Sequence, residues 1–119
     1  MIKLVEKREE FVFSIDEIRF PTNAAETYYE IIKELAAAVF LLDGFKATGE
    51  SAHKEIINSL AKYKEFNESE ISIIDDLRIK RNKSSYEGKQ VELSYIENKK
   101  DELLKIIAKL KGLLNKKLS

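Results

Sequence analysis

The 119-residue sequence predicts an all-α fold, a five-helix up-and-down bundle, from three observations. Apolar residues recur at spacings of three and four along most of the chain, which is the period of one helix face. No stretch alternates apolar and polar residues strongly enough to indicate a sheet. One proline and four glycines punctuate the chain, so the expected connections are short and helices pack mostly antiparallel. The length fits one domain, residues 1–119.

The first two helices are expected at residues 2–19 and 23–43. The first has imperfect periodicity and ends before Pro21, and its segment EFVFSI is also compatible with a short strand. The second ends at Gly44, a residue that favours helix termination. Its apolar face is a regular stripe at helical spacing: Tyr28, Ile31, Ile32, Leu35, Ala36, Val39 and Leu42.

The remaining three helices are expected at residues 51–64, 67–88 and 90–117. The fourth begins at Asn67 and closes at Gly88. The fifth carries a heptad-like seam that requires a helical partner along its length: Leu93, Ile96, Lys100, Leu103, Ile107, Leu110 and Leu114.

Two pairs of residues have the spacing of an N-terminal capping box. Asn23 precedes Glu26 by three positions, and Asn67 precedes Glu70 by three. In such a box the first side chain accepts a hydrogen bond from the backbone three residues on, and the second side chain returns one. We therefore expect capping boxes at the starts of the second and fourth helices.

The composition excludes several classes of site. Without cysteine, the chain has no disulfide scaffold, cysteine-based zinc site or thiol nucleophile. A single histidine excludes histidine-rich metal sites, and we expect neither a metal nor a cofactor. A formal net charge of zero argues against a nucleic-acid coat protein held by charge alone. The longest apolar run is too short to span a membrane and the N-terminus alternates charges, so a cytoplasmic protein is expected.

The end of the fourth helix is unusually polar. Residues 77–88 read LRIKRNKSSYEG, and the apolar stripe of Ile74 and Leu77 continues at helical spacing onto Arg81. Arg81 therefore lies either where the helix emerges into solvent or in a polar pocket or subunit interface. The planar guanidinium binds phosphate at two points and stays charged when partly desolvated, which suits the second interpretation.

The same stretch resembles the HEPN family, whose name stands for higher eukaryotes and prokaryotes nucleotide-binding. The family pattern is an Arg, usually followed by a polar residue such as Asn, and then His after four to six intervening residues. Arg81 and Asn82 match its opening, and Tyr86 stands where the pattern expects His. The segment GFKATGESAHKEIINSL also resembles the family's Gly-containing loop and its helix carrying a histidine, here His53. The resemblance covers about residues 23–117.

The resemblance implies a metal-independent RNA endonuclease fold in which two subunits form one composite cleft. Arg81 and Tyr86 are then the catalytic candidates. The residues implied to bind phosphate or RNA are Arg78, Arg81, Asn82, Ser85 and His53. Tyrosine has a reference pKa near 10 and is a poor base at neutral pH, so RNA binding with little or no cleavage is expected. The implied partners are a second copy, paired through the fourth helix, RNA or a nucleotide, and a nucleotidyltransferase in a toxin–antitoxin-like pair.

Two interpretations of function stay open. The first is the HEPN-type RNA- or nucleotide-binding protein, and the second is a non-catalytic helical dimerisation or protein-interaction module. The environment of Arg81 distinguishes them, because a shared cleft favours the first and an ion pair with Asp or Glu on the outer surface favours the second. For His53, a packed and hydrogen-bonded role stays open beside a role in acid–base chemistry.

Overall fold

Three long helices form the body of the computed structural model. It describes residues 6–10, 18–44 and 58–118. Within these ranges every regular element is helical, which confirms the all-α class. Residues 6–10 and 58–60 add short helical stretches. The long helices are α2, Pro21–Leu42, α4, Glu68–Glu87, and α5, Leu93–Leu118.

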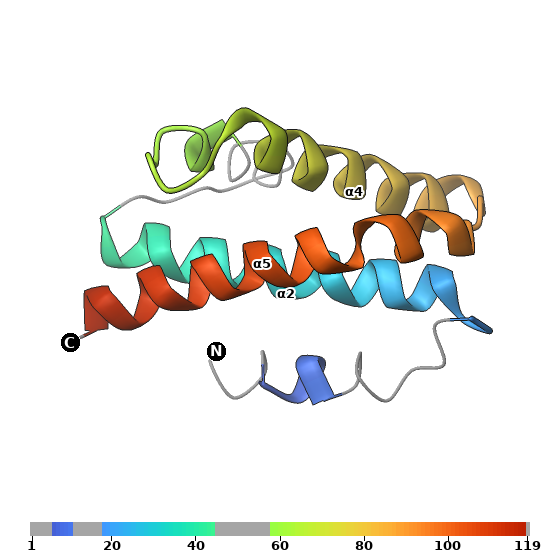
Figure 1. Ribbon diagram of the computed structural model, residues 1–119, viewed down its shortest axis with the longest axis horizontal. Coiled ribbons are helices and arrows are strands. Elements are labelled where there is room, and N and C mark those ends of the chain that lie inside the picture. The colour runs from blue at the N-terminus through green and yellow to red at the C-terminus, as the bar shows by residue number, and fades with distance from the viewer. Residues whose placement is uncertain (1–5, 11–17, 45–57, 119) are drawn as a thin grey trace.

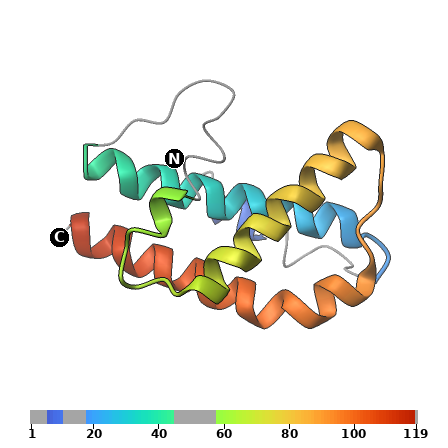
Figure 2. The ribbon, with the colours of Figure 1, turned by 90° about the horizontal axis from the view of Figure 1, so that it is seen from above.

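The long helices are arranged around one shared core. Helices α2 and α5 lie side by side and run in the same direction, while α4 runs the opposite way (Figure 1). Seen from above, α4 crosses from over α5 to over the first half of α2 (Figure 2). In a strictly alternating five-helix bundle α5 would oppose α2. The expected order has α2 and α4 running in the same direction, but in the structure they run in opposite directions (Figure 1). As a result α5 is parallel to α2, which departs from the expected up-and-down order.

Helix α2 begins at Pro21, two residues before the expected start. Proline suits the first helical position because its fixed φ is already helical and its missing N–H would have no partner there. The preceding Phe20 makes no side-chain cap. The capping box expected at Asn23 is therefore wrong, since Asn23 already lies inside the helix and its carbonyl accepts a hydrogen bond from Thr27 Oγ1 at 2.9 Å.

Helix α4 has both of its expected ends. The Glu70 N–H donates to Asn67 Oδ1 at 2.8 Å, and the Asn67 N–H donates to Glu70 Oε1 at 3.1 Å, which confirms the capping box. At the other end Gly88 takes φ +69°, a left-handed conformation that glycine adopts without a steric penalty. The Lys89 N–H then bonds back to the Lys83 carbonyl at 3.2 Å and closes the helix.

Two expected boundaries differ from the structure. The third helix was expected to continue to residue 64, but residues 61–66 form turns, closed by the Tyr63 N–H bond to the Leu60 carbonyl. Helix α5 begins at Leu93, three residues after the expected start. The strand alternative for EFVFSI falls on residues that lie almost entirely outside the described ranges.

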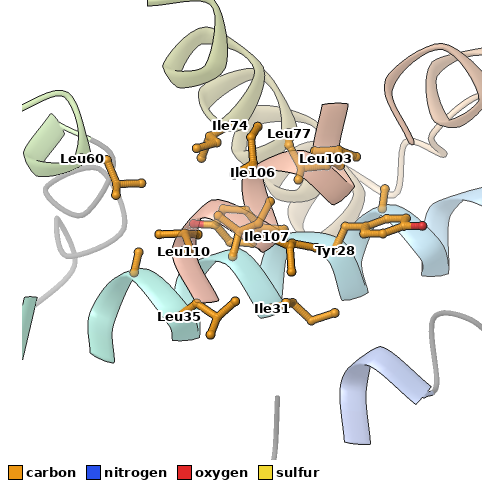
Figure 3. Packing of buried hydrophobic residues seen from close by; sticks show 14 of the residues in the cluster. Tyr28, Ile31, Leu35, Leu60, Ile74, Leu77, Leu103, Ile106, Ile107 and Leu110 are labelled. Atoms are coloured by element: carbon orange, nitrogen blue, oxygen red, sulfur yellow. The ribbon is translucent and has the colours of Figure 1, made fainter. Parts of the chain in front are cut away.

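The apolar stripes of the long helices meet in the core (Figure 3). The stripe of α2 is buried as expected up to Val39, but Leu42, at the last turn, is 47% exposed. Ile74 and Leu77 are the buried contribution of α4. The seam of α5 finds its partner in α2, and five of its seven expected members are buried: Ile96, Leu103, Ile107, Leu110 and Leu114. Leu93 and Lys100 are only half-buried, and Ile106, which was not expected in the seam, is buried as well. Among the described helices, none is both long enough and apolar enough to cross a bilayer.

Candidate functional site

Arg81 connects two helices. Its Nη2 lies 3.3 Å from Glu30 Oε1 on α2, and its guanidinium carbon lies 5.8 Å from the centre of the Tyr29 ring. The side chain is 24% exposed and that of Glu30 is 17% exposed. Arg81 follows Ile74 and Leu77 on the face of α4 that packs onto α2, so its charge is met there by a carboxylate. This position explains why an apolar stripe ends in an arginine.

Glu30 is shared by cations from three segments. Besides Arg81, its carboxylate contacts Lys33 Nζ at 2.7 Å and Arg8 Nη1 at 3.7 Å. Arg8 also pairs with Glu34 at 3.0 Å. These partly buried contacts tie residues 6–10 and α4 to opposite sides of α2. The network therefore holds three segments in register around one carboxylate.

Burial raises the pKa of Tyr29 to about 12. The positive charges of Arg81 and Arg78 act in the opposite direction, because they favour the phenolate. Burial is the larger effect, so the fold keeps the Tyr29 phenol neutral. This tyrosine is a packing residue below Arg81 and cannot serve as a base near neutral pH.

Arg78 also has a carboxylate partner. Its Nε donates to Asp75 Oδ1 at 3.0 Å, one turn earlier on α4. The two side chains are 19% and 43% exposed, respectively. Both guanidinium groups that the sequence pointed to as an anion site are thus engaged within the chain. A bound phosphate would have to compete with Glu30 and Asp75 for them.

The other expected site residues are not gathered around Arg81. Tyr86 is 81% exposed on α4, and five helical residues place it about 140° around the helix axis from Arg81. Asn82 is half-buried on the same helix. Ser85 belongs to α4 but its side chain lies outside the described part, as does His53. No group of three His, Asp or Glu side chains that could hold a metal ion occurs among the described residues.

Two hydrogen bonds of hydroxyl side chains connect α2 to the last part of α4 and to the α4–α5 connection. No pattern in the sequence predicted either contact. Ser84 Oγ donates to Glu26 Oε1 at 2.8 Å, which adds a second link between α4 and α2. The Val91 N–H donates to Thr22 Oγ1 at 2.8 Å and holds the α4–α5 connection against the start of α2. Hydroxyl groups bond to many partners, so only the tertiary arrangement identifies these pairs.

The outward face of α4 carries an exposed stripe at heptad-like spacing. Its apolar members are Ile79, 38% exposed, and the Tyr86 ring. Within the stripe the acidic residues Glu68 and Asp76 precede Ile79, and the basic residue Lys83 follows it. Its members, all exposed, are Glu68, Ser72, Asp76, Ile79, Lys83 and Tyr86.

The HEPN resemblance therefore rests on the Arg81–Asn82 pair and the segment before α4, and it stays a prediction. The sequence matches no protein-family model, and no curated protein or solved structure is significantly similar to it.

Proposed function

We propose that this chain is a non-catalytic helical dimerisation module that pairs through α4 with α4 of a second copy. The observation that supports this proposal is the outward stripe of α4, in which the exposed Ile79 lies between the acidic Asp76 and the basic Lys83. Arg81 pairs with a carboxylate of its own chain, which agrees with the second interpretation, although the pair is partly buried between α4 and α2 and does not lie on the outer surface.

Antiparallel pairing of two such stripes brings opposite charges together. Asp76 and Lys83 lie equally far on either side of a point just after Ile79, and both project from the same side of the outward face. A two-fold axis at that point places each Asp76 opposite Lys83 of the second copy, with the two Ile79 side chains in contact between them. The surface is self-complementary, as an isologous dimer requires.

The expected dimer is weak and sensitive to salt. A single pair of helices lies at the low end of interface sizes, and two exposed ion pairs contribute little to affinity. Charge complementarity acts mainly by selecting the antiparallel register, since parallel pairing would set like charges against each other. Association at low ionic strength and dissociation at high ionic strength follow from this.

Charge reversal tests the proposal. Sedimentation equilibrium of the wild-type chain should show a monomer–dimer equilibrium at low salt. Asp76→Lys and Lys83→Asp should each abolish it, because each creates like-charge pairs, and the double variant should restore it. Lys62→Asp changes an exposed lysine at the other end of the molecule and is the matched control. A wild-type monomer at all concentrations, or a double variant as weak as the single ones, overturns the proposal.

RNA binding of the HEPN type is the second candidate function. Its support is the basic composition of the last part of α4 and the connection after it, with the side chains of Arg78, Lys80, Arg81, Lys83 and Lys89. Positive charge of this density binds nucleic-acid backbones in a salt-dependent way. The nucleotidyltransferase partner implied by the resemblance belongs to this candidate function alone.

A further inference from the structure

A small pocket lies where α4 ends and α5 begins. Its volume is about 190 Å³, and three of the residues that line it are lysines. The Lys80 ammonium lies 4.8 Å from the centre of the Tyr95 ring, which forms part of the wall. The complete lining is Lys80, Lys83, Lys89, Gln90, Val91, Glu92 and Tyr95.

The pocket is built by the closure of α4. The left-handed Gly88 turns the chain back, and the hydrogen bond from the Lys89 N–H to the Lys83 carbonyl brings these two lysines to the same helix end. The following connection is pinned to α2 by the Val91–Thr22 hydrogen bond. Lys80 lies one turn earlier, and its contact with the Tyr95 ring holds its ammonium toward α5. The lysines are thus held together by backbone and ring contacts.

The charges of the pocket are unbalanced. Three lysines face one carboxylate, Glu92, in its lining, and the Asp76 carboxylate lies near the Tyr95 side chain of the wall. Within the described residues, neither Lys80, Lys83 nor Lys89 forms an ion pair, whereas lysines on α5, such as Lys109 and Lys111, do. Clustered ammonium groups repel one another, and an anion between them relieves that repulsion. Helix α4 ends and helix α5 begins at the pocket, so the negative end of one helix dipole and the positive end of the other lie there together, and the lysine side chains supply its positive charge.

We infer that this pocket binds a small phosphate-type oxyanion, held by Lys80 and Lys89 with Lys83 at its rim. The inferred site is separate from Arg78 and Arg81. It shares Lys83 with the proposed dimer interface but does not require the dimer to form. Ligand pockets for drug-sized molecules have about 300–1,000 Å³, so a volume of about 190 Å³ suits one phosphate group better than a whole nucleotide. The phosphate is either free or the terminal group of a larger molecule that extends outward.

The test is a titration of ¹⁵N-labelled full-length protein with inorganic phosphate at constant ionic strength, followed by amide chemical shifts. Saturable shifts are expected at residues 88–93, with millimolar or tighter affinity. The double variant Lys80→Gln/Lys89→Gln should bind about tenfold more weakly, since a hydrogen bond to a charged group contributes that much or more. It retains Lys83, which the proposed dimer uses.

A matched double variant separates the pocket from net charge. Lys62→Gln/Lys64→Gln removes the same charge from exposed lysines at the opposite end, and it should bind phosphate like the wild type. Parallel titrations with pyrophosphate and a nucleoside triphosphate identify the source, because tighter binding of the larger anions indicates a terminal phosphate. Where the Lys80→Gln/Lys89→Gln variant fails to fold, the single Lys89→Gln variant carries the test. No saturable shift in the wild type, or equal weakening in both double variants, overturns the inference.

Discussion

The Arg81 guanidinium lies 3.3 Å from the Glu30 carboxylate and joins α4 to α2. This contact gives the basic second half of α4 a structural role, because Glu30 is also the partner of Arg8 and Lys33. Among the described surfaces, the outward face of α4 and the lysine pocket at its end are the two at which we propose partners. The dimer and phosphate proposals follow from this division of the helix into an inner and an outer face.

The ion pair between Arg81 and Glu30 should stabilise the fold modestly. A double-mutant cycle with Arg81→Gln and Glu30→Gln is expected to give a coupling free energy of about 1 kcal/mol, since both groups are only partly exposed. The cycle for Arg78 and Asp75, neighbours on one helix, is the control and should give about 0.3 kcal/mol. Urea denaturation measures both. A coupling for Arg81 and Glu30 no larger than the control would show that the contact is not a structural link.

The capping box at the start of α4 should contribute measurably to stability. Asn67→Ala removes the acceptor of the Glu70 N–H and is expected to lower the free energy of unfolding by about 1 kcal/mol. Asn98→Ala, at an exposed position inside α5, is the matched control and should be neutral or slightly stabilising, because alanine is the better helix former. Thermal unfolding followed by circular dichroism compares the two. Equal melting temperatures would contradict the assignment of the cap.

Alkaline pH should destabilise the protein through its buried tyrosines. Burial raises the pKa of Tyr29 from 10.0 to about 12, so the fold favours the neutral phenol. The resulting stability is fully present below pH 10 and is lost as the pH rises through the folded-state pKa. The Tyr29→Phe variant should therefore lose less stability than the wild type as the pH rises from 10.0 to about 12. Tyr86→Phe removes an exposed phenol and is the control. Identical pH profiles for wild type and Tyr29→Phe would refute the prediction.

RNA should be bound with little or no cleavage if the HEPN interpretation holds. Tyr86→His restores the family pattern and is then expected to raise metal-independent cleavage of single-stranded RNA, because an imidazole titrates near neutral pH. Arg81→Ala should weaken RNA binding and reduce its salt dependence. The assay incubates the three proteins with labelled RNA in chelator. Strong wild-type cleavage that Arg81→Ala abolishes would show that Tyr86 supports catalysis, and no binding by any variant would sink the RNA interpretation.

Local signals in the sequence predicted much of the fold. The period of apolar residues located α2, α4 and α5, because a buried helix face repeats every three to four residues. Asn67 with Glu70, and Gly88, located both ends of α4, since a cap is made within a few residues of one chain segment. The start of α2 was placed two residues too late, because Pro21 and Asn23 each provide a local signal for a helix start. The helix uses Pro21, and local signals alone do not decide between the two.

What the sequence by itself determined is therefore the helical class, most of the core and the basic end of α4. The tertiary structure alone decided that α2 and α5 run parallel and that Arg81 meets Glu30, 51 residues earlier in the chain. It also decided that Lys80 and Lys89 share a pocket with Tyr95. Helical periodicity states which face of a helix is buried but not which helix covers it. The partner of a charged side chain is chosen by how the helices pack, and that choice depends on contacts between residues far apart in the sequence.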